Sequence, residues 1–144
     1  MILLDTNVLS ELMRPQPDPA VVAWVDGHAG EARVCAVTLA EISLGIALLP
    51  EGRRRDALSQ ATRQMFQEDF AGRCLPFDAR AAEIFGQVVA ERRRNGRPIS
   101  PQDAQIAAIA LANGDGRATR NVDDFLGIAG LEVVNPWGQH GRID

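Results

Sequence analysis

Acidic residues in four regions carry the clearest chemistry in this sequence. Asp5 directly follows an apolar run, Glu41 and Asp103 fall in the first turns of predicted helices, and the pair Asp123-Asp124 follows a predicted strand. In an open parallel sheet, residues just past the carboxyl ends of the strands converge on one crevice. We therefore expect acids from four separate regions to lie at one edge of the sheet.

Carboxylates gathered in this way repel one another and need a counter-ion. A hard divalent cation suits an all-oxygen cluster, and Mg²⁺ in proteins takes one or two carboxylates and keeps several waters for a phosphate substrate. Such ions can activate a water molecule and stabilise the leaving oxygen of a phosphodiester. Replacing Asp5 with Asn should then leave the metal-free fold intact or more stable, because one repelling charge is removed.

Each acid also has a simpler structural explanation. Thr38 and Glu41 fit the S/T-x-x-E pattern of a helix capping box. Ser100 and Asp103 form a near variant, with Asp in place of Glu. Capping contributes about 1 kcal/mol, which is reason enough for such residues to occur. Asp5 is harder to explain as a cap, because an unpaired carboxylate after a buried strand is costly.

Strands and helices alternate along the chain, which predicts a parallel sheet covered by helices on both faces. The expected strands are short apolar or β-branched stretches at residues 2–4, 33–37, 74–77, 117–120 (as a strand edge) and 131–134. The expected helices lie at residues 8–13, 19–27, 38–49, 51–70, 79–94 and 101–113. We expect one α/β domain, residues 1–137, followed by a polar tail, residues 138–144.

The composition excludes several classes of function. All 15 basic residues of the 144-residue chain are Arg. The chain thus lacks the lysine that P-loop, Schiff-base and kinase chemistry requires. Two isolated Cys and two His form no zinc-binding spacing, so we expect two reduced thiols. There is no basic, apolar leader and no apolar run of about 18 residues, so we expect a cytoplasmic protein that does not span a membrane.

Five motifs, in this order, resemble a PIN domain: ILLDTN at 2–7, TLAEI at 38–42, DAQIAA at 103–108, ATRNVDDF at 118–125 and NPW at 135–137. The turn MRP at 13–15 and the closing NPW resemble the FitB-like branch of the VapC-type toxins of bacterial toxin–antitoxin pairs. The resemblance covers residues 1 to about 137. It implies a three-layer α/β/α fold around a central parallel sheet.

The resemblance also implies an activity and the residues that carry it. The activity is that of a Mg²⁺- or Mn²⁺-dependent endoribonuclease, which hydrolyses RNA phosphodiester bonds with metal-activated water. Asp5 and Asp103 match the two aspartates that usually hold the metal, and Glu41 matches the glutamate that orients metal-bound water or a second ion. For the fourth acid, some relatives use the position of Asn121 and others that of Asp124. We assign the role to Asp124, with Asn121 as a neutral neighbour in the site.

Polar neighbours complete this predicted site. Thr6, Asn7 and Thr119 match residues that support the acidic cluster. Because the amide of Asn121 carries no charge, we expect one firmly bound ion and a second only together with substrate.

The chain has a net charge of −4, which is not typical of a nucleic-acid-binding protein. Local arginines matter more, and Arg120, nearest to the predicted crevice in sequence, is our first choice for a phosphate contact. The arginine clusters within 53–55 and 92–97 could also meet phosphates, or could be ordinary solvated helix faces.

The resemblance further implies partners. These are a second copy of the chain in a homodimer and a small VapB- or FitA-like antitoxin whose tail lies over the acidic crevice. An Arg or Lys in that tail would compete with the metal for Asp5 and Asp103. The alternative is a non-catalytic PIN-like module that only binds RNA or protein. Asn121 is the one feature that favours this alternative, since Asp5, Glu41 and Asp103 are all present.

Overall fold

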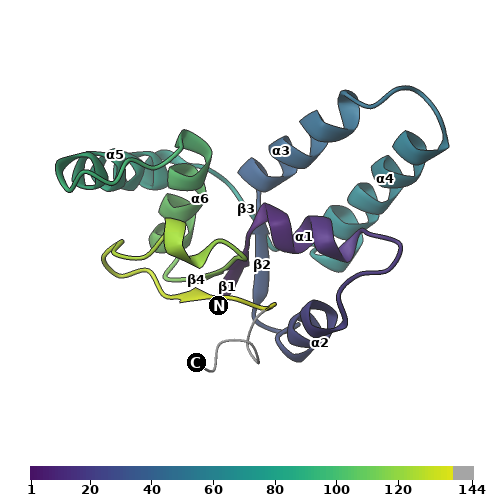
Figure 1. Ribbon diagram of the computed structural model, residues 1–144, viewed down its shortest axis with the longest axis horizontal. Coiled ribbons are helices and arrows are strands. Elements are labelled where there is room, and N and C mark those ends of the chain that lie inside the picture. The colour runs from purple at the N-terminus through teal and green to yellow at the C-terminus, as the bar shows by residue number, and fades with distance from the viewer. Residues whose placement is uncertain (138–144) are drawn as a thin grey trace.

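The computed structural model describes residues 1–137, which fold around a parallel sheet of five strands (Figure 1). The strands are β1 (Ile2–Leu4), β2 (Ala32–Cys35), β3 (Cys74–Leu75), β4 (Gly116–Ala118) and β5 (Val133–Val134). Their order across the sheet is β3-β2-β1-β4-β5, and each neighbouring pair is parallel. The predicted α/β fold with a central parallel sheet is therefore confirmed.

Helices cover the two faces of this sheet. They are α1 (Thr6–Leu12), α2 (Pro19–Gly27), α3 (Ala36–Ala47), α4 (Arg53–Gln64), α5 (Ala79–Arg94) and α6 (Pro101–Ala112). A π-helical turn, η1 (Met65–Asp69), continues α4, and a 3₁₀ turn, η2 (Val122–Asp124), follows β4. Figure 1 shows α1 to α4 on one side of the sheet and the packed pair α5 and α6 on the other.

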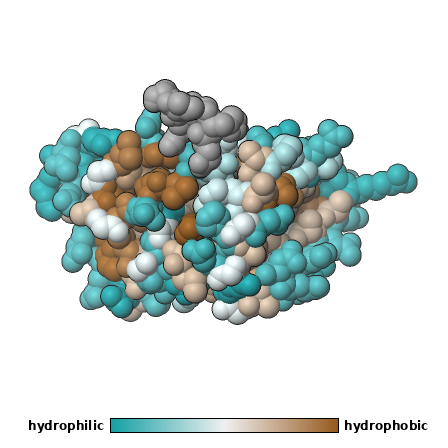
Figure 2. All heavy atoms as spheres, turned by 90° about the horizontal axis from the view of Figure 1, so that it is seen from below, coloured by the Kyte–Doolittle hydropathy of each residue, from teal (hydrophilic) through white to brown (hydrophobic). Residues whose placement is uncertain are grey.

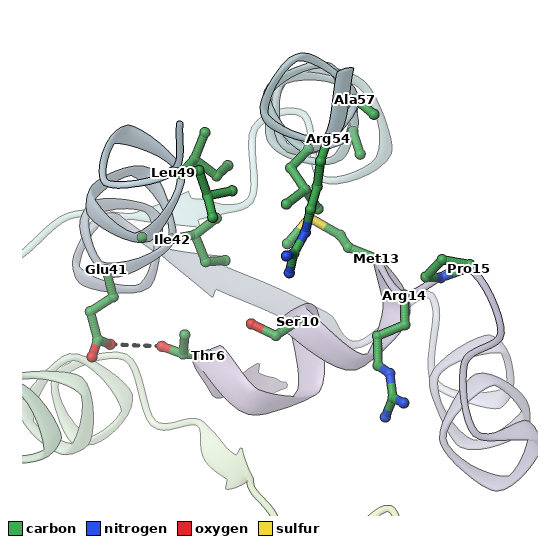
Figure 3. A pocket seen from close by; sticks show the side chains of 14 residues that line it. Thr6, Ser10, Met13, Arg14, Pro15, Glu41, Ile42, Leu49, Arg54 and Ala57 are labelled. Carbon is green, nitrogen blue, oxygen red and sulfur yellow. Dashed lines mark hydrogen bonds between the residues drawn. The ribbon is translucent and has the colours of Figure 1, made fainter. Parts of the chain in front are cut away.

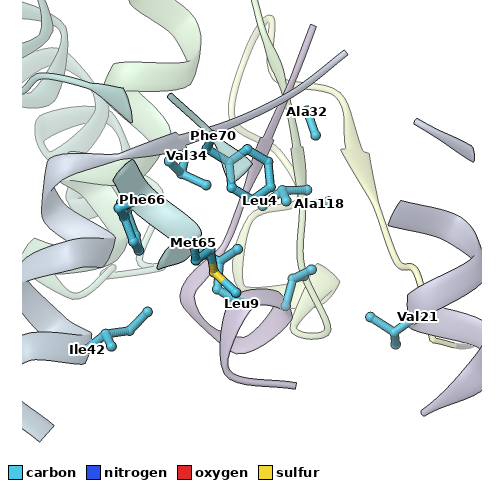
Figure 4. Close-up of a cluster of buried hydrophobic side chains, with 11 residues drawn as sticks. Leu4, Leu9, Val21, Ala32, Val34, Ile42, Met65, Phe66, Phe70 and Ala118 are labelled. Carbon is cyan, nitrogen blue, oxygen red and sulfur yellow. The ribbon is translucent and has the colours of Figure 1, made fainter. Parts of the chain in front are cut away.

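Strand β1 contributes to a separate core on each face, because successive side chains of a strand point to opposite faces. Leu4 packs with Leu9 of α1 and Phe66 of η1 (Figure 4). Leu3 packs on the other face with Ile106 of α6. All of these side chains are buried. The residue that follows β1 is thus held in place by both layers.

Three helices begin as the sequence predicts. The carboxylates of Asp18 and Asp78 accept hydrogen bonds from backbone N–H groups in the first turns of α2 and α5. The Ser100 hydroxyl accepts from the N–H of Asp103 at 3.2 Å and caps α6.

The predicted start of α3 is wrong. The helix begins at Ala36, and its N-cap is Cys35, which makes no side-chain capping bond. Thr38 therefore lies inside the helix, buried, with its hydroxyl 3.4 Å from the Cys35 sulfur. A Thr38–Glu41 capping box does not form, so the simpler explanation of Glu41 is removed.

Two other predictions need correction. The predicted 51–70 helix starts later, at Arg53, because Gly52 adopts a φ of 152° that is not helical. The stretch 117–120 is not a strand edge, because β4 lies between β1 and β5. Arg117 in β4 is consequently a fully buried side chain. The predicted tail, residues 138–144, lies outside the described residues.

The outer surface is mostly hydrophilic on the face seen in Figure 2, with hydrophobic groups gathered toward one side of that face. The exposed large hydrophobic side chains are Met1, Leu44, Leu48 and Leu126. Within residues 1–137, no helix combines the length and apolar character needed to cross a membrane.

The two Ser/Thr-x-x-acid patterns should differ in stability measurements. Ser100→Ala should lower the free energy of unfolding by about 1 kcal/mol, because it removes a cap. Thr38→Val, which keeps the shape of a side chain that caps nothing, should lower it by clearly less. Urea unfolding of the two variants checks this, and an equal or larger loss in Thr38→Val would contradict the observed start of α3.

Candidate active site

A cleft of about 500 Å³ opens at the carboxyl end of β1. Seven residues predicted for the site line it: Asp5, Thr6, Asn7, Glu41, Asp103, Arg120 and Asn121. The sequence analysis missed four further lining residues: Ser10, Glu11, Arg14 and Trp137. The fold therefore brings together three acids that are far apart in the sequence.

Asp5 is the most buried of these acids, with 5% of its surface exposed. It is the N-cap of α1, and its Oδ1 accepts the N–H of Thr6 at 2.8 Å. Its Oδ2 accepts the hydroxyl of Thr119 at 2.7 Å. A cap at Asp5 was hard to explain from the sequence, yet Asp5 caps α1. Hydrogen bonds to both oxygens fix the orientation of the carboxylate.

Glu41 reaches the cleft from the first half of α3. Its Oε1 accepts the Thr6 hydroxyl at 2.7 Å, a contact between residues 35 positions apart (Figure 3). Thr6 therefore joins Glu41 to the turn that begins with Asp5. The partner of Glu41 lies across the cleft rather than on its own helix, which is the arrangement expected of a site residue.

A network of polar groups supports Asp5 from the side of β4. The Thr119 hydroxyl, which donates to Asp5, accepts the side-chain amide of Asn7 at 3.2 Å and the N–H of Asn121 at 3.1 Å. The side-chain oxygen of Asn7 accepts the N–H of Arg120 at 3.3 Å. The three predicted supporting residues, Thr6, Asn7 and Thr119, all contact the acidic residues or each other.

Sequence reasoning also missed Arg117, which does not line the cleft but contacts two of its acids. Its Nη2 lies 2.9 Å from Asp5 Oδ1 and 3.4 Å from Asp103 Oδ1. Its Nη1 donates to the Asp103 carbonyl at 3.0 Å, and its guanidinium lies over the Phe125 ring, 3.6 Å from the centroid. An arginine within a predicted strand was the available signal. Because that strand was taken as an edge of the sheet, the burial of Arg117 was not predicted.

The pair Asp123 and Asp124 does not line the cleft. Both side chains line a neighbouring hollow of about 540 Å³, together with Arg120, Asn121 and Asn135. Asn121 lines both cavities, whereas Asp124 lines only the hollow. The structure thus places Asn121, and not Asp124, beside the other three predicted residues.

The arginine cluster around residues 92–97 has a structural role at two of its positions. Arg92 is buried, and its Nε donates to the carbonyl of Arg97 at 2.7 Å. The Nη2 of Arg97 donates to the carbonyl of Asp123 at 3.2 Å. These bonds fasten the end of α5 to η2, so these two guanidinium groups do not extend toward a phosphate backbone.

A third cavity, an apolar groove of about 760 Å³, is lined mostly by residues of α1, α3 and α4 (Figure 3). Met13, Ile42, Leu49 and Leu58 contribute apolar side chains to it. It shares Thr6, Ser10, Arg14 and Glu41 with the cleft. The apolar groove therefore runs into the acidic cleft.

A family model described as PIN domain matches residues 2–131 of the chain. The chain belongs to the PIN domain family. It is 43% identical over 138 residues to the toxin FitB of Neisseria gonorrhoeae, covering 95% of this chain and 99% of FitB. It is 41% identical over 138 residues to the VapC ribonuclease Y4jK of Sinorhizobium fredii, covering 95% and 98% of the two chains.

The solved structures agree with this placement in the PIN family. A chain in the crystal structure of FitAcB from Neisseria gonorrhoeae superposes with a TM-score of 0.86 at 42% identity. The match covers 95% of the present chain and 99% of the chain in that crystal structure. Both the α/β/α architecture and the resemblance stated from the motifs are thereby confirmed.

The donor set of this PIN-domain cleft fits a hydrated hard cation. It consists of carboxylate, hydroxyl and amide oxygens, with no Cys or His. Within residues 1–137, no three His, Cys, Asp or Glu side chains come close enough to form a metal site by themselves. Mg²⁺ bound through one or two carboxylates and several waters needs no such cage. The residues present therefore suit an ion of this kind.

The contact with Arg117 reverses the expected effect of Asp5→Asn on stability. The substitution removes the charge that faces a fully buried guanidinium, so it should lower the free energy of unfolding by about 2 kcal/mol. Asp123→Asn, at an exposed aspartate, is the matched control and should be neutral. Urea unfolding in EDTA checks both, and an Asp5→Asn variant as stable as the wild type would show that the ion pair contributes little.

Proposed function

We propose that this chain is a divalent-metal-dependent endoribonuclease and the toxin of a toxin–antitoxin pair. One observation carries the proposal: Asp5, Glu41 and Asp103, from three separate elements, line a single cleft. Membership of the PIN family and the likeness to a VapC ribonuclease and to the toxin FitB support the same reaction class. RNA is the substrate.

In this proposal Asp5, Asp103 and Glu41 hold Mg²⁺ or Mn²⁺. The bound ion supplies a Lewis acid for the phosphate and lowers the pKa of water. Hydrogen bonds from Thr6 and Thr119 keep the Asp5 carboxylate in one orientation. Glu41 is held through Oε1 by the Thr6 hydroxyl, and it would orient the attacking water.

Arg120 binds the RNA backbone in this proposal. Its side chain is exposed at the cleft and lies over the Trp137 ring, 5.1 Å from the centroid. Its backbone N–H is held by Asn7. An exposed guanidinium placed beside three acids can neutralise a phosphate that the acids would otherwise repel.

The proposed antitoxin occupies the apolar groove. Residues of α1, α3 and α4 line this groove, and one end of it reaches Glu41 at the cleft. A segment bound there can place a basic residue against the acids. We also propose a homodimer, to which the exposed side chains of Leu44 on α3 and Leu48, its C-cap, contribute apolar contacts.

A non-catalytic PIN-like module is the competing hypothesis. It rests on Asn121, an amide at a position where some relatives have an acid. The hypothesis requires the remaining acids to be dispensable, whereas Asp5, Glu41 and Asp103 are all present and line one cleft.

Cleavage of total host RNA by the purified, antitoxin-free chain tests the proposal. With Mg²⁺ or Mn²⁺ the wild type should give discrete cuts, and EDTA, Asp5→Asn and Glu41→Gln should each abolish them. Loss of one catalytic group of this kind typically costs a factor of about 10²–10⁴. Far-ultraviolet circular dichroism of each variant establishes that it is folded.

Asp123→Asn and Asp124→Asn are matched controls, because both remove an aspartate from the neighbouring hollow. Both should keep most of the activity. Selective loss in Asp124→Asn would restore Asp124 as the fourth acid. Full activity in Asp5→Asn would refute the nuclease assignment.

Arg120→Ala should weaken RNA binding without abolishing the fold. Loss of one phosphate contact should reduce the slope of log affinity against log salt by about 1. Filter binding in Ca²⁺ or EDTA over a salt series measures this slope. Arg93→Ala, which removes an exposed arginine of α5, is the control. An equal change of slope in this variant would show that overall charge, and not a contact at Arg120, is responsible.

A further inference from the structure

Arg117 is a buried cation placed against the two aspartates of the proposed metal site. Its side chain is 0% exposed, and it emerges from β4 in the interior of the sheet. The side chain of a surface arginine can rotate toward solvent, but the buried side chain of Arg117 cannot reach it. Its charge must be balanced by the groups that surround it.

Four contacts hold the guanidinium in position. Two are to carboxylates, Asp5 and Asp103, one is to the Asp103 carbonyl, and one is to the face of Phe125. Its Nε, also buried, has no hydrogen-bond partner. An arginine kept only for packing would not need two carboxylates, and an apolar side chain would fill the space without leaving an N–H unpaired. Its positive charge is therefore the property that the site uses.

Arg117 contacts a carboxylate oxygen of each of the two aspartates that would hold the metal ion. Oδ1 of Asp5 already accepts from Thr6 and lies 2.9 Å from Nη2, and Oδ2 accepts from Thr119. Asp103 is the more accessible of the two, with a side chain 35% exposed. The two carboxylates that would hold the ion therefore already share one buried nitrogen.

The charges around the cleft lead to the same conclusion. Glu11, the fourth acid that lines the cleft, is paired with Arg14. Asp5, Glu41 and Asp103 bring three further negative charges, and Arg117 cancels one of them. The remaining two match a single divalent ion. A second ion would bring excess positive charge next to a cation that cannot lose its proton.

We propose that Arg117 is a built-in counter-ion of the acidic cluster. It holds Asp5 and Asp103 together in the metal-free chain, and it limits the site to one divalent ion bound with reduced affinity. The inference rests on the proposed metal dependence. Arg117 is a positioning residue here, because it acts through the two aspartates and does not line the cleft.

Mn²⁺ binding to Arg117→Met tests the inference without reference to activity. The variant should bind Mn²⁺ about tenfold more tightly than the wild type, because a like charge beside the ion is removed. It should also be less stable than the wild type in EDTA and recover more stability when Mn²⁺ is added. Electron paramagnetic resonance counts free Mn²⁺, and thermal unfolding with EDTA or Mn²⁺ measures the recovery.

Arg33→Met is the matched control. Arg33 also binds a buried aspartate, Asp115, through two hydrogen bonds, and neither residue lines the cleft. This variant should lose stability to the same extent in EDTA and in Mn²⁺, with unchanged Mn²⁺ affinity. Tighter Mn²⁺ binding in Arg33→Met as well would overturn the inference, because it would attribute the effect to general loosening of the fold.

The possible results separate the inference from the proposed function. Equal Mn²⁺ affinity in the wild type and Arg117→Met overturns the inference and leaves metal dependence intact. Binding only in Arg117→Met supports the inference and contradicts metal dependence of the wild type. A variant that folds only with Mn²⁺ supports the inference. An Arg117→Met chain that stays unfolded in saturating Mn²⁺, or binds none, shows that the guanidinium acts in packing and overturns it.

Discussion

The carboxylate of Asp5 is the group on which the rest of the site depends. It is almost fully buried, and it is held by the backbone of Thr6, the hydroxyl of Thr119 and the guanidinium of Arg117. A buried charge of this kind is tolerated only when it is paired and hydrogen-bonded. The start of α1, the residue after β4 and the buried arginine must therefore all lie within bonding distance of the Asp5 carboxylate. Satisfying this one group fixes the geometry of the cleft.

The sheet makes such agreement possible. β1 is flanked by β2 and β4, so the turn after β1 lies between the residues that follow both neighbours. Glu41 arrives from the helix after β2, and Thr119 follows β4. Asp103 arrives from the first turn of α6, whose N-cap is Ser100. The site is thus a product of strand order, and each of its long-range contacts also ties two elements of the fold together. Stability and chemistry share the same side chains, which is why their substitution needs a separate test of folding.

The sequence was sufficient to predict what depends on short-range signals. The parallel sheet followed from the alternation of elements, and the caps at Asp18, Asp78 and Ser100 followed from local patterns. The convergence of Asp5, Glu41 and Asp103 followed from the rule for parallel sheets. The start of α3 did not follow, because Thr38-x-x-Glu41 has the form of a capping box. In the structure Thr38 instead contacts the nearby Cys35, and Glu41 contacts Thr6 from a distant part of the chain.

Arg117 and Asp124 show the limit of such reasoning more sharply. An arginine reads as a surface residue until the order of the strands is known, and strand order is a property of the whole chain. Asp124 and Asn121 are three positions apart, yet a single 3₁₀ turn directs Asp124 into the neighbouring hollow. Neither outcome has a local signature. Both depend on packing between β4, η2 and Phe125.

The most direct test of this account is a crystal structure of the chain grown or soaked with Mn²⁺, located by its anomalous scattering. The account predicts one Mn²⁺ in the cleft, bound by carboxylates from among Asp5, Asp103 and Glu41, with Arg117 still in contact with Asp5. A cleft without Mn²⁺ at saturating concentration would contradict the proposed metal site. Two ions, with Arg117 displaced, would contradict the role of the buried arginine.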